Sequence, residues 1–179
     1  MAYQLNFDGS NDYVSTPAIS ITTDFTVEIE IEYVATSGFT FFASAWPGTN
    51  SRWYVGTDDN QFRFFHGTIG SYNGTVLNDG QVYKLTVERL NGDVNLYLDG
   101  ALETTLTDTS DWKDIERFGS SLDDRFYTPS KLRWWSFTDG VNNRFYDADA
   151  SNGTGSVLPD TASNQDGTLT NFPTDDSQW

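Results

Sequence analysis

The 179-residue chain lacks cysteine altogether and contains a single histidine and a single methionine. Without cysteine it forms no disulfide, no thiolate zinc site and no cysteine nucleophile. Basic residues are scarce too, since 10 Lys and Arg stand against 26 Asp and Glu, for a net charge of −16. A nucleic-acid-binding protein needs a basic surface, so this balance argues against nucleic acid as a partner. No run approaches the roughly 18 apolar residues of a membrane span, so we predict no membrane insertion.

Aromatic residues, by contrast, make up 16% of the chain. That content is too high for a disordered acidic protein, and the length suits one domain with its own core. The first nine residues read as a strand and a turn, and they lack the basic and apolar segments of a secretory signal. We therefore expect either a protein that is not exported by that route or one whose leader is missing from this chain.

The dominant hydrophobic period is two residues, which is the period of a β-strand. In segment 25–34 apolar side chains alternate with glutamates, and segments 82–88 and 94–98 alternate in the same way. The dipeptides Asn91-Gly92 and Asp99-Gly100 favour two-residue hairpin turns, because both residue types tolerate a positive φ. Together these patterns predict three consecutive antiparallel strands.

Other strand candidates are short, and no segment shows ten residues of helical periodicity. Many short strands with few helices are typical of sandwiches and barrels. We predict an all-β fold, a two-sheet antiparallel β-sandwich over residues 1–146, followed by an irregular extension over residues 147–179. We expect Leu169 and Phe172 to hold the extension against the sandwich, with a disordered linker as the alternative. The remaining strands are expected near residues 3–7, 12–16, 39–45, 51–57, 61–66, 115–119, 131–138 and 143–147.

Several segments resemble one known family. Residues 5–14 (LNFDGSNDYV) resemble the opening strand pair of laminin-G-like, concanavalin A-like jelly-roll domains. Residues 24–28 (DFTVE) resemble their third strand, and residues 97–100 (YLDG) their central hairpin. The block 151–173 is similar to the tail of such domains in bacteriophage virion proteins. The resemblance implies a concanavalin A-like jelly roll, a fold that serves lectins, adhesion modules, virion parts and glycoside hydrolases alike.

The resemblance implies first a non-enzymatic bacteriophage virion surface protein, of the capsid-decoration or fibre type, with a glycan- or cell-surface adhesion role. A phage leaves its host by lysis, so its surface proteins need no export leader. The expected location is the virion surface, and the expected partners are capsid or tail proteins and further copies of the chain, because such positions are symmetric. The alternatives are a secreted, extracellular bacterial carbohydrate-binding module and a retaining glycoside hydrolase.

The hydrolase alternative rests on Glu28, Glu30 and Glu32, which share one strand face. Retaining endo-glucanases of this fold carry a Glu-x-Asp-x-Glu strand, so the resemblance implies Glu28 and Glu32 as nucleophile and acid/base. The two carboxyl groups must lie about 5–5.5 Å apart, whereas strand residues four apart have Cα atoms ~13 Å apart. Glu30 is longer than Asp and crowds that arrangement. We favour a solvated polar face paired across strands with Lys84 or Arg63, and we predict no enzymatic activity.

Aromatic side chains beside polar groups in segment 46–54 indicate glycan binding. A ring face stacks on a sugar, and neighbouring amide or guanidinium groups hold its hydroxyls. For any single tryptophan the alternative is packing in the core. Trp134 and Trp135 are adjacent on a strand and must point to opposite faces, so one of them is expected in the core. The predicted ligand-binding residues are Trp46, Asn50, Arg52, Trp53 and Tyr54.

Acidic residues in turns indicate a calcium site, because calcium takes several oxygen ligands from carboxylates and carbonyls. Laminin-G-like relatives often hold calcium at a sheet rim, so the resemblance implies a bound ion there. No calcium-loop spacing is present, and ordinary turn-forming residues are the alternative. The candidate metal ligands are Asp8, Asn11, Asp12, Asp99 and Asp147, with Asp149 nearby.

Overall fold

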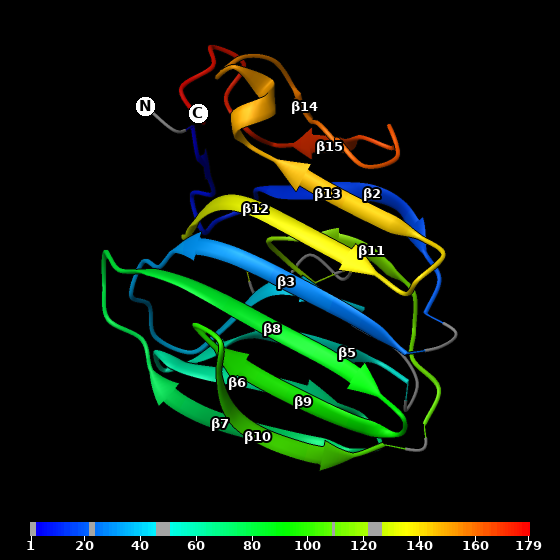
Figure 1. Cartoon of the computed structure of the whole chain (residues 1–179). Coiled ribbons are helices and arrows are strands. Elements are labelled where there is room, and N and C mark those ends of the chain that lie inside the picture. The colour runs from blue at the N-terminus through cyan, green and yellow to red at the C-terminus, as the bar shows by residue number, and fades with distance from the viewer. Residues whose placement is uncertain (1–2, 22–23, 46–50, 109, 122–126) are drawn as a thin grey trace.

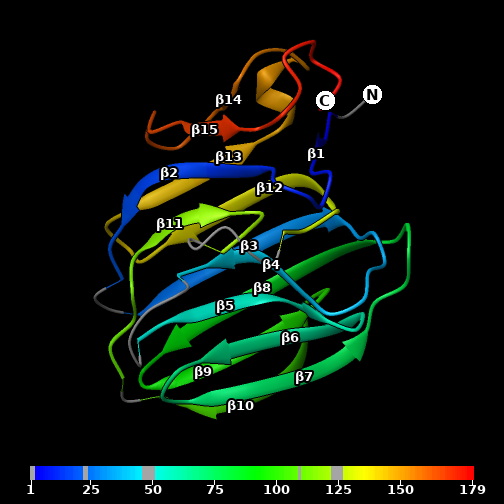
Figure 2. The same ribbon diagram turned by 180° about the vertical axis from the view of Figure 1, so that it is seen from behind.

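The computed structural model describes residues 3–21, 24–45, 51–108, 110–121 and 127–179. Two antiparallel sheets pack face to face (Figures 1 and 2), which confirms the predicted all-β sandwich. Within the described ranges, no helix is long and apolar enough to cross a bilayer.

The first sheet contains, in spatial order, β1 (Leu5–Asn6), β12 (Lys131–Thr138), β3 (Phe25–Glu32), β8 (Val82–Leu90), β9 (Asp93–Leu98) and β10 (Ala101–Thr107). In addition, β13 (Asn143–Asp147) pairs with β12, and a short 3₁₀ helix, η1 (Asp149–Ser151), follows it. The second sheet contains β14 (Val157–Leu158), β15 (Gly167–Thr170), β2 (Tyr13–Ile19), β11 (Ile115–Phe118), β4 (Phe39–Ser44), β5 (Trp53–Asp58), β6 (Gln61–His66) and β7 (Gly70–Val76).

The alternating pattern of β3 determines which of its faces is buried. Val27, Ile29 and Ile31 are at most 2% exposed and pack into the core, while the glutamates between them point outward. Across the core, the ring of Phe118 on β11 stacks on Trp135 of β12, with centroids 5.1 Å apart. Burial of apolar and aromatic area between the sheets is therefore the main stabilising term, as it must be in a chain without disulfides.

The two hairpins that join β8, β9 and β10 form as the dipeptides predict. Asn91 and Gly92 have φ angles of 53° and 87°, and Asp99 and Gly100 have φ angles of 50° and 81°. Positive φ at both central residues matches the twist of the flanking strands. The expected three-stranded antiparallel unit is confirmed.

Strand β7 is absent from the sequence prediction, because its residues do not alternate in polarity. It lies at the edge of the second sheet, where neither face is fully buried. It pairs with β6 and also contacts Glu103 of β10, whose carboxylate accepts hydrogen bonds from the Tyr72 hydroxyl (2.9 Å) and the Thr75 N–H (3.1 Å). A Cβ on Gly74 would lie 2.6 Å from that carboxylate, so glycine allows the close approach.

The C-terminal extension is less irregular than its composition indicates. β15 pairs with β2 and places Leu169 opposite Val14, so the extension adds strands to the second sheet. Leu169 and Phe172 are each 9% exposed and belong to the core, and the Phe172 ring contacts Phe7 at a centroid distance of 5.2 Å. The extension therefore packs on the sandwich through the residues expected to hold it.

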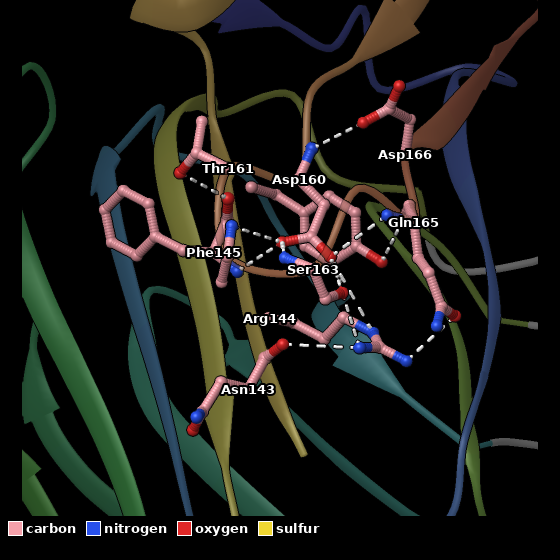
Figure 3. A network of polar contacts seen from close by, with 10 residues as sticks. Asn143, Arg144, Phe145, Asp160, Thr161, Ser163, Gln165 and Asp166 are labelled. Atoms are coloured by element: carbon pink, nitrogen blue, oxygen red, sulfur yellow. Dashed lines mark hydrogen bonds and ion pairs between the residues drawn. The ribbon is translucent and has the colours of Figure 1, made fainter.

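A buried ion pair also fastens the extension to β13 (Figure 3). The Asp160 side chain is fully buried and accepts hydrogen bonds from the backbone N–H groups of Phe145 (2.9 Å) and Ala162 (3.0 Å). Arg144 on β13 lies with its Nε 3.9 Å from Asp160 Oδ2 and donates to Ser163 Oγ at 2.6 Å. A buried charge is tolerated only when it is paired and hydrogen-bonded, and this network supplies both conditions.

Candidate functional site

The glutamates of β3 form ion pairs on the outer face of the first sheet. Glu28 Oε1 lies 2.6 Å from Lys84 Nζ, and Glu32 Oε1 lies 2.5 Å from Lys131 Nζ. Glu30 is paired with an arginine of β12 at 3.3 Å. The predicted pairing with Lys84 is confirmed, and each carboxylate has its own cation.

Arg63, the other predicted partner, lies on β6 in the second sheet and pairs there with Asp58 at 2.5 Å, so that part of the prediction is wrong. The hydrogen bond from Lys131 lowers the pKa of the Glu32 carboxyl. A general acid requires a raised pKa, so this environment does not suit Glu32 to the acid role in glycoside hydrolysis.

Replacing Glu28 with glutamine is expected to lower the free energy of unfolding by no more than about 1 kcal/mol, because the pair with Lys84 is partly exposed. Urea unfolding measures the difference, which should shrink in 1 M salt. Glu30→Gln is the matched control and, with its longer contact, should cost less. A loss above about 2 kcal/mol, or a change in hydrolysis of any glycan, would point to a role beyond surface pairing.

Trp53 lies in the core instead of on a ligand-binding surface. Its side chain is fully buried, its Nε1 donates to the Lys113 carbonyl at 2.9 Å, and its ring contacts Trp112 at a centroid distance of 5.4 Å. The indole face is not available to a sugar, because this face of β5 meets the opposite sheet.

Tyr54 points to the other side of β5 and stacks on Phe41 and Phe65, with ring centroids 3.9 Å and 5.7 Å away. The guanidinium of Arg52 lies 5.6 Å from the centre of the Phe65 ring. The structure therefore brings Arg52 and Tyr54 together around Phe65, although Tyr54 itself is only 3% exposed. Trp46 and Asn50 lie outside the described residues.

Trp134 and Trp135 point to opposite faces of β12, as expected. Trp135 is fully buried in the core. Trp134 is half-buried on the outer face, where its ring stacks on Phe145 at 5.6 Å and Lys84 Nζ lies 5.7 Å from its centre.

The acidic residues expected to bind calcium lie in three separate places: Asp8 and Asp12 share one turn, Asp99 lies in a hairpin turn, and Asp147 ends β13. Asp8 Oδ1 accepts hydrogen bonds from the N–H groups of Ser10 (2.7 Å) and Asn11 (3.3 Å), and Asp12 Oδ2 accepts from the Asp8 N–H at 2.9 Å. Asp99 follows β9, four strands away from β1 in the first sheet. Asp147 is the last residue of β13, and its Oδ1 accepts from the Asp149 N–H at 3.0 Å. In the part of the chain that the structure describes, no three acidic, histidine or cysteine side chains gather as metal ligands. Calcium binding by these residues stays a prediction.

The first strand and the C-terminal segment lie close together at one end of the sandwich (Figures 1 and 2). Residues of both segments line a surface groove. The N–H of Asn6 donates to the Gln178 carbonyl at 2.7 Å and joins the two segments. The groove, which we call the terminal groove, has a volume of about 440 Å³, within the range of small-molecule sites. It is lined by Tyr3, Gln4, Asn6, Phe7, Pro129, Lys131 and Trp179.

Two aromatic rings of the terminal groove are fixed by the extension. The Tyr3 N–H donates to Asp149 Oδ1 at 2.5 Å, and the Tyr3 ring packs against Gly153, where a Cβ would lie 2.3 Å from the ring. Trp179 Nε1 donates to the Gly155 carbonyl at 3.2 Å. Tyr3 remains 42% exposed and Trp179 is half-buried, so both rings present surface to solvent. Rings that are already held in place lose little conformational freedom when a ligand binds.

Polar groups line the terminal groove beside these rings. Asn6 Oδ1 is buried and accepts no hydrogen bond from the described residues. Because buried polar atoms normally have a partner, this oxygen marks a place that a ligand or a water can complete. The Lys131 side chain is 39% exposed and its Nζ is held by Glu32. Ring faces beside an acceptor and an ammonium donor can bind the polar and apolar surfaces of a sugar.

The sequence pattern does not reveal this groove. Its lining comes from residues 3–7, residues 129–131 and residue 179, which meet only because β1 pairs with β12 and the extension returns to β1. The aromatic residues near the two ends of the chain, Tyr3 and Trp179, could have suggested a binding site. Their sequence positions do not show, however, whether their rings are exposed.

No protein-family model matches the chain, and no curated protein matches its sequence. Solved structures match its fold. A candidate carbohydrate-binding protein from Bacteroides ovatus superposes with a TM-score of 0.70 at 17% identity, over 95% of this chain and 58% of that one. Domains LG4–5 of the mouse laminin α1 chain superpose with a TM-score of 0.59 at 13% identity, over 77% of this chain and 42% of theirs. The inhibitor complex of a Trypanosoma rangeli sialidase matches with a TM-score of 0.55 at 12% identity, over 75% of this chain and 25% of that enzyme.

The chain thus spans little more than half of the Bacteroides protein and less of the other two. At these identities the likeness shows the fold and not the activity. The chain has the laminin-G-like, concanavalin A-like jelly-roll fold.

Proposed function

We propose that this chain is a non-catalytic carbohydrate-binding module and that the terminal groove is its binding site. The observation that carries the proposal is that one groove is lined by Tyr3, Trp179, Lys131 and Asn6, whose Oδ1 has no hydrogen-bond partner among the described residues. The fold shared with the Bacteroides protein supports it, since that protein is described as a candidate for carbohydrate binding.

The charge of the chain favours a neutral glycan as the ligand. A net charge of −16 repels anionic ligands at long range, and Lys131, the one basic side chain among the described lining residues, is already paired with Glu32. Neutral sugars bind through hydroxyl hydrogen bonds and stacking, which the groove offers.

Replacing Trp179 with alanine is expected to weaken glycan binding at least about tenfold, because loss of a central aromatic contact commonly costs more than about 1.4 kcal/mol. A glycan array followed by calorimetry on the best ligand measures the effect. Trp134→Ala is the matched control, since it removes a half-buried indole from the outer face of the first sheet, away from the groove. If both variants lose the same glycan affinity, or if Trp179→Ala loses none, the terminal groove is not the binding site.

A parallel glycan array run with a chelator tests the calcium prediction.

The virion role is a second proposal, with capsid or tail proteins and further copies of the chain as partners. The observation that favours it is the block 151–173, which resembles the tail of phage versions of this domain and which packs against the sandwich through β15. Capsid, portal or tail genes beside the coding gene would support a place on the virion surface. A coding gene that joins the domain to upstream secretory segments would favour an extracellular module.

A further inference from the structure

The C-terminal segment also borders a second hollow. It has a volume of about 570 Å³ and is lined by residues of the extension, among them Leu169, Phe172 and Gln178. We call it the Gln178 cavity. Gln178 lines this cavity and the next residue, Trp179, lines the terminal groove, so two consecutive residues border the two hollows.

The Gln178 side chain is held in one orientation with its oxygen unused. It is 3% exposed, and its Nε2 donates to the Gly155 carbonyl at 2.9 Å. Exchanging the oxygen and nitrogen would place two carbonyl oxygens together, so the Nε2 bond settles the amide orientation. Oε1 is buried and receives no hydrogen bond from any residue in the described ranges. A buried acceptor without a donor is costly, and an entering N–H group can supply the missing bond after a small rotation of the amide.

The described lining of the cavity combines apolar side chains with polar groups and the Asp176 carboxylate. Leu169 and Phe172 are each 9% exposed and belong to the core, so the apolar wall is rigid. Asn171 and Thr174 contribute polar groups. The one acid of the lining, Asp176, accepts a hydrogen bond from the Gly155 N–H at 2.7 Å, and no basic residue is among the described lining residues. The cavity therefore suits an uncharged group that combines an N–H donor with a small apolar end.

We propose that the Gln178 cavity binds the acetamido group of an N-acetylhexosamine, while the adjoining sugar of the same oligosaccharide stacks on Trp179 in the terminal groove. The acetamido N–H donates to Gln178 Oε1, and the methyl group packs on Leu169 and Phe172. The inference rests on the proposed carbohydrate-binding function and adds the ligand class. An acetamido group would use both the Gln178 oxygen, which has no donor among the described residues, and the apolar wall of the cavity. A hexose without this group would use neither.

Calorimetry of the full chain with the trisaccharide of β1,4-linked N-acetylglucosamine and with the matching glucose trisaccharide tests the proposal. Both ligands are neutral, so the comparison isolates the acetamido group. We expect the N-acetylated ligand to bind at least about tenfold more tightly, since a site built for a polar group strongly rejects the analogue that lacks it. Thr174→Phe, at an exposed position of the lining, should remove this preference by filling the cavity. Ser177→Phe adds the same bulk at an exposed position outside the lining and should leave the preference intact.

The outcomes separate this inference from the proposed function. If the two trisaccharides bind equally and Trp179→Ala weakens both, the acetamido site is wrong and the carbohydrate-binding function stands. If neither these ligands nor any glycan on an array binds, the function itself fails and the inference with it. The side-chain amide resonance of Gln178 gives an independent readout, because it should shift when N-acetylglucosamine is added to the unmodified chain. An unshifted resonance at saturation overturns the assignment.

Discussion

Asp160→Ala is expected to lower the free energy of unfolding by about 3–5 kcal/mol, because it leaves the buried Arg144 without its counter-charge. The change also removes the acceptor for the N–H groups of Phe145 and Ala162, which lie in β13 and the extension. Since these bonds join the extension to the sandwich, hydrogen exchange should rise first in residues 157–170.

Urea unfolding of the variant and the unmodified chain measures this loss. Asp166→Ala is the matched control, because Asp166 is an exposed carboxylate that accepts a hydrogen bond from the Asp160 N–H at 2.8 Å. Its replacement should cost about 1 kcal/mol or less. If both variants unfold alike, the buried pair does not hold the extension.

The same carboxyl gives stability a defined dependence on pH. Burial opposes ionisation of Asp160, but the hydrogen bonds from Phe145, Ser163 and neighbouring N–H groups outweigh it, so the pKa lies below its ordinary value of 3.8. A folded-state pKa below the unfolded one gives stability that is present above the unfolded pKa and is lost as the pH falls through the folded pKa. The stability difference between the unmodified chain and Asp160→Asn should therefore be constant at neutral pH and narrow below about pH 4.

Trp53→Ala is expected to lower the free energy of unfolding by about 3–5 kcal/mol, because it removes a fully buried indole and leaves a cavity beside Trp112. The Lys113 carbonyl loses its donor as well. Chemical denaturation measures the loss, and Trp134→Ala, which removes a half-buried ring, should cost markedly less.

The result for Trp53 also decides between its two roles. A core residue affects glycan binding only through unfolding, so Trp53→Phe, which keeps most of the ring volume, should bind glycans as the unmodified chain does. If the Trp53→Phe variant is stable but no longer binds glycans, the prediction that Trp53 binds the ligand is supported instead.

Local sequence patterns were sufficient to predict most of the strands and two of the hairpins. The alternation in β3 determined its buried face, and the Asn-Gly and Asp-Gly dipeptides determined two hairpins, because both features act between residues close in sequence. β7 was not predicted, because neither face of this edge strand is fully buried and its sequence therefore lacks hydrophobic alternation.

The functional surface could not be foreseen in the same way. Segment 46–54 looked like a binding loop because aromatic and polar residues are mixed there, yet Trp53 faces the opposite sheet and is fully buried. The terminal groove, in turn, unites Tyr3 with Trp179, residues at the two ends of the described chain.

By itself, then, the sequence determined the fold class, the absence of disulfides, the acidic surface and the polar outer face of β3. The exposure of each aromatic ring, the pairing of carboxylates with cations, and the Asn6 and Gln178 oxygens that lack a partner among the described residues became known from the three-dimensional structure. The physical reason is that periodicity and turn preference are short-range properties, whereas exposure and hydrogen-bond satisfaction depend on strands and extensions that meet across the whole chain.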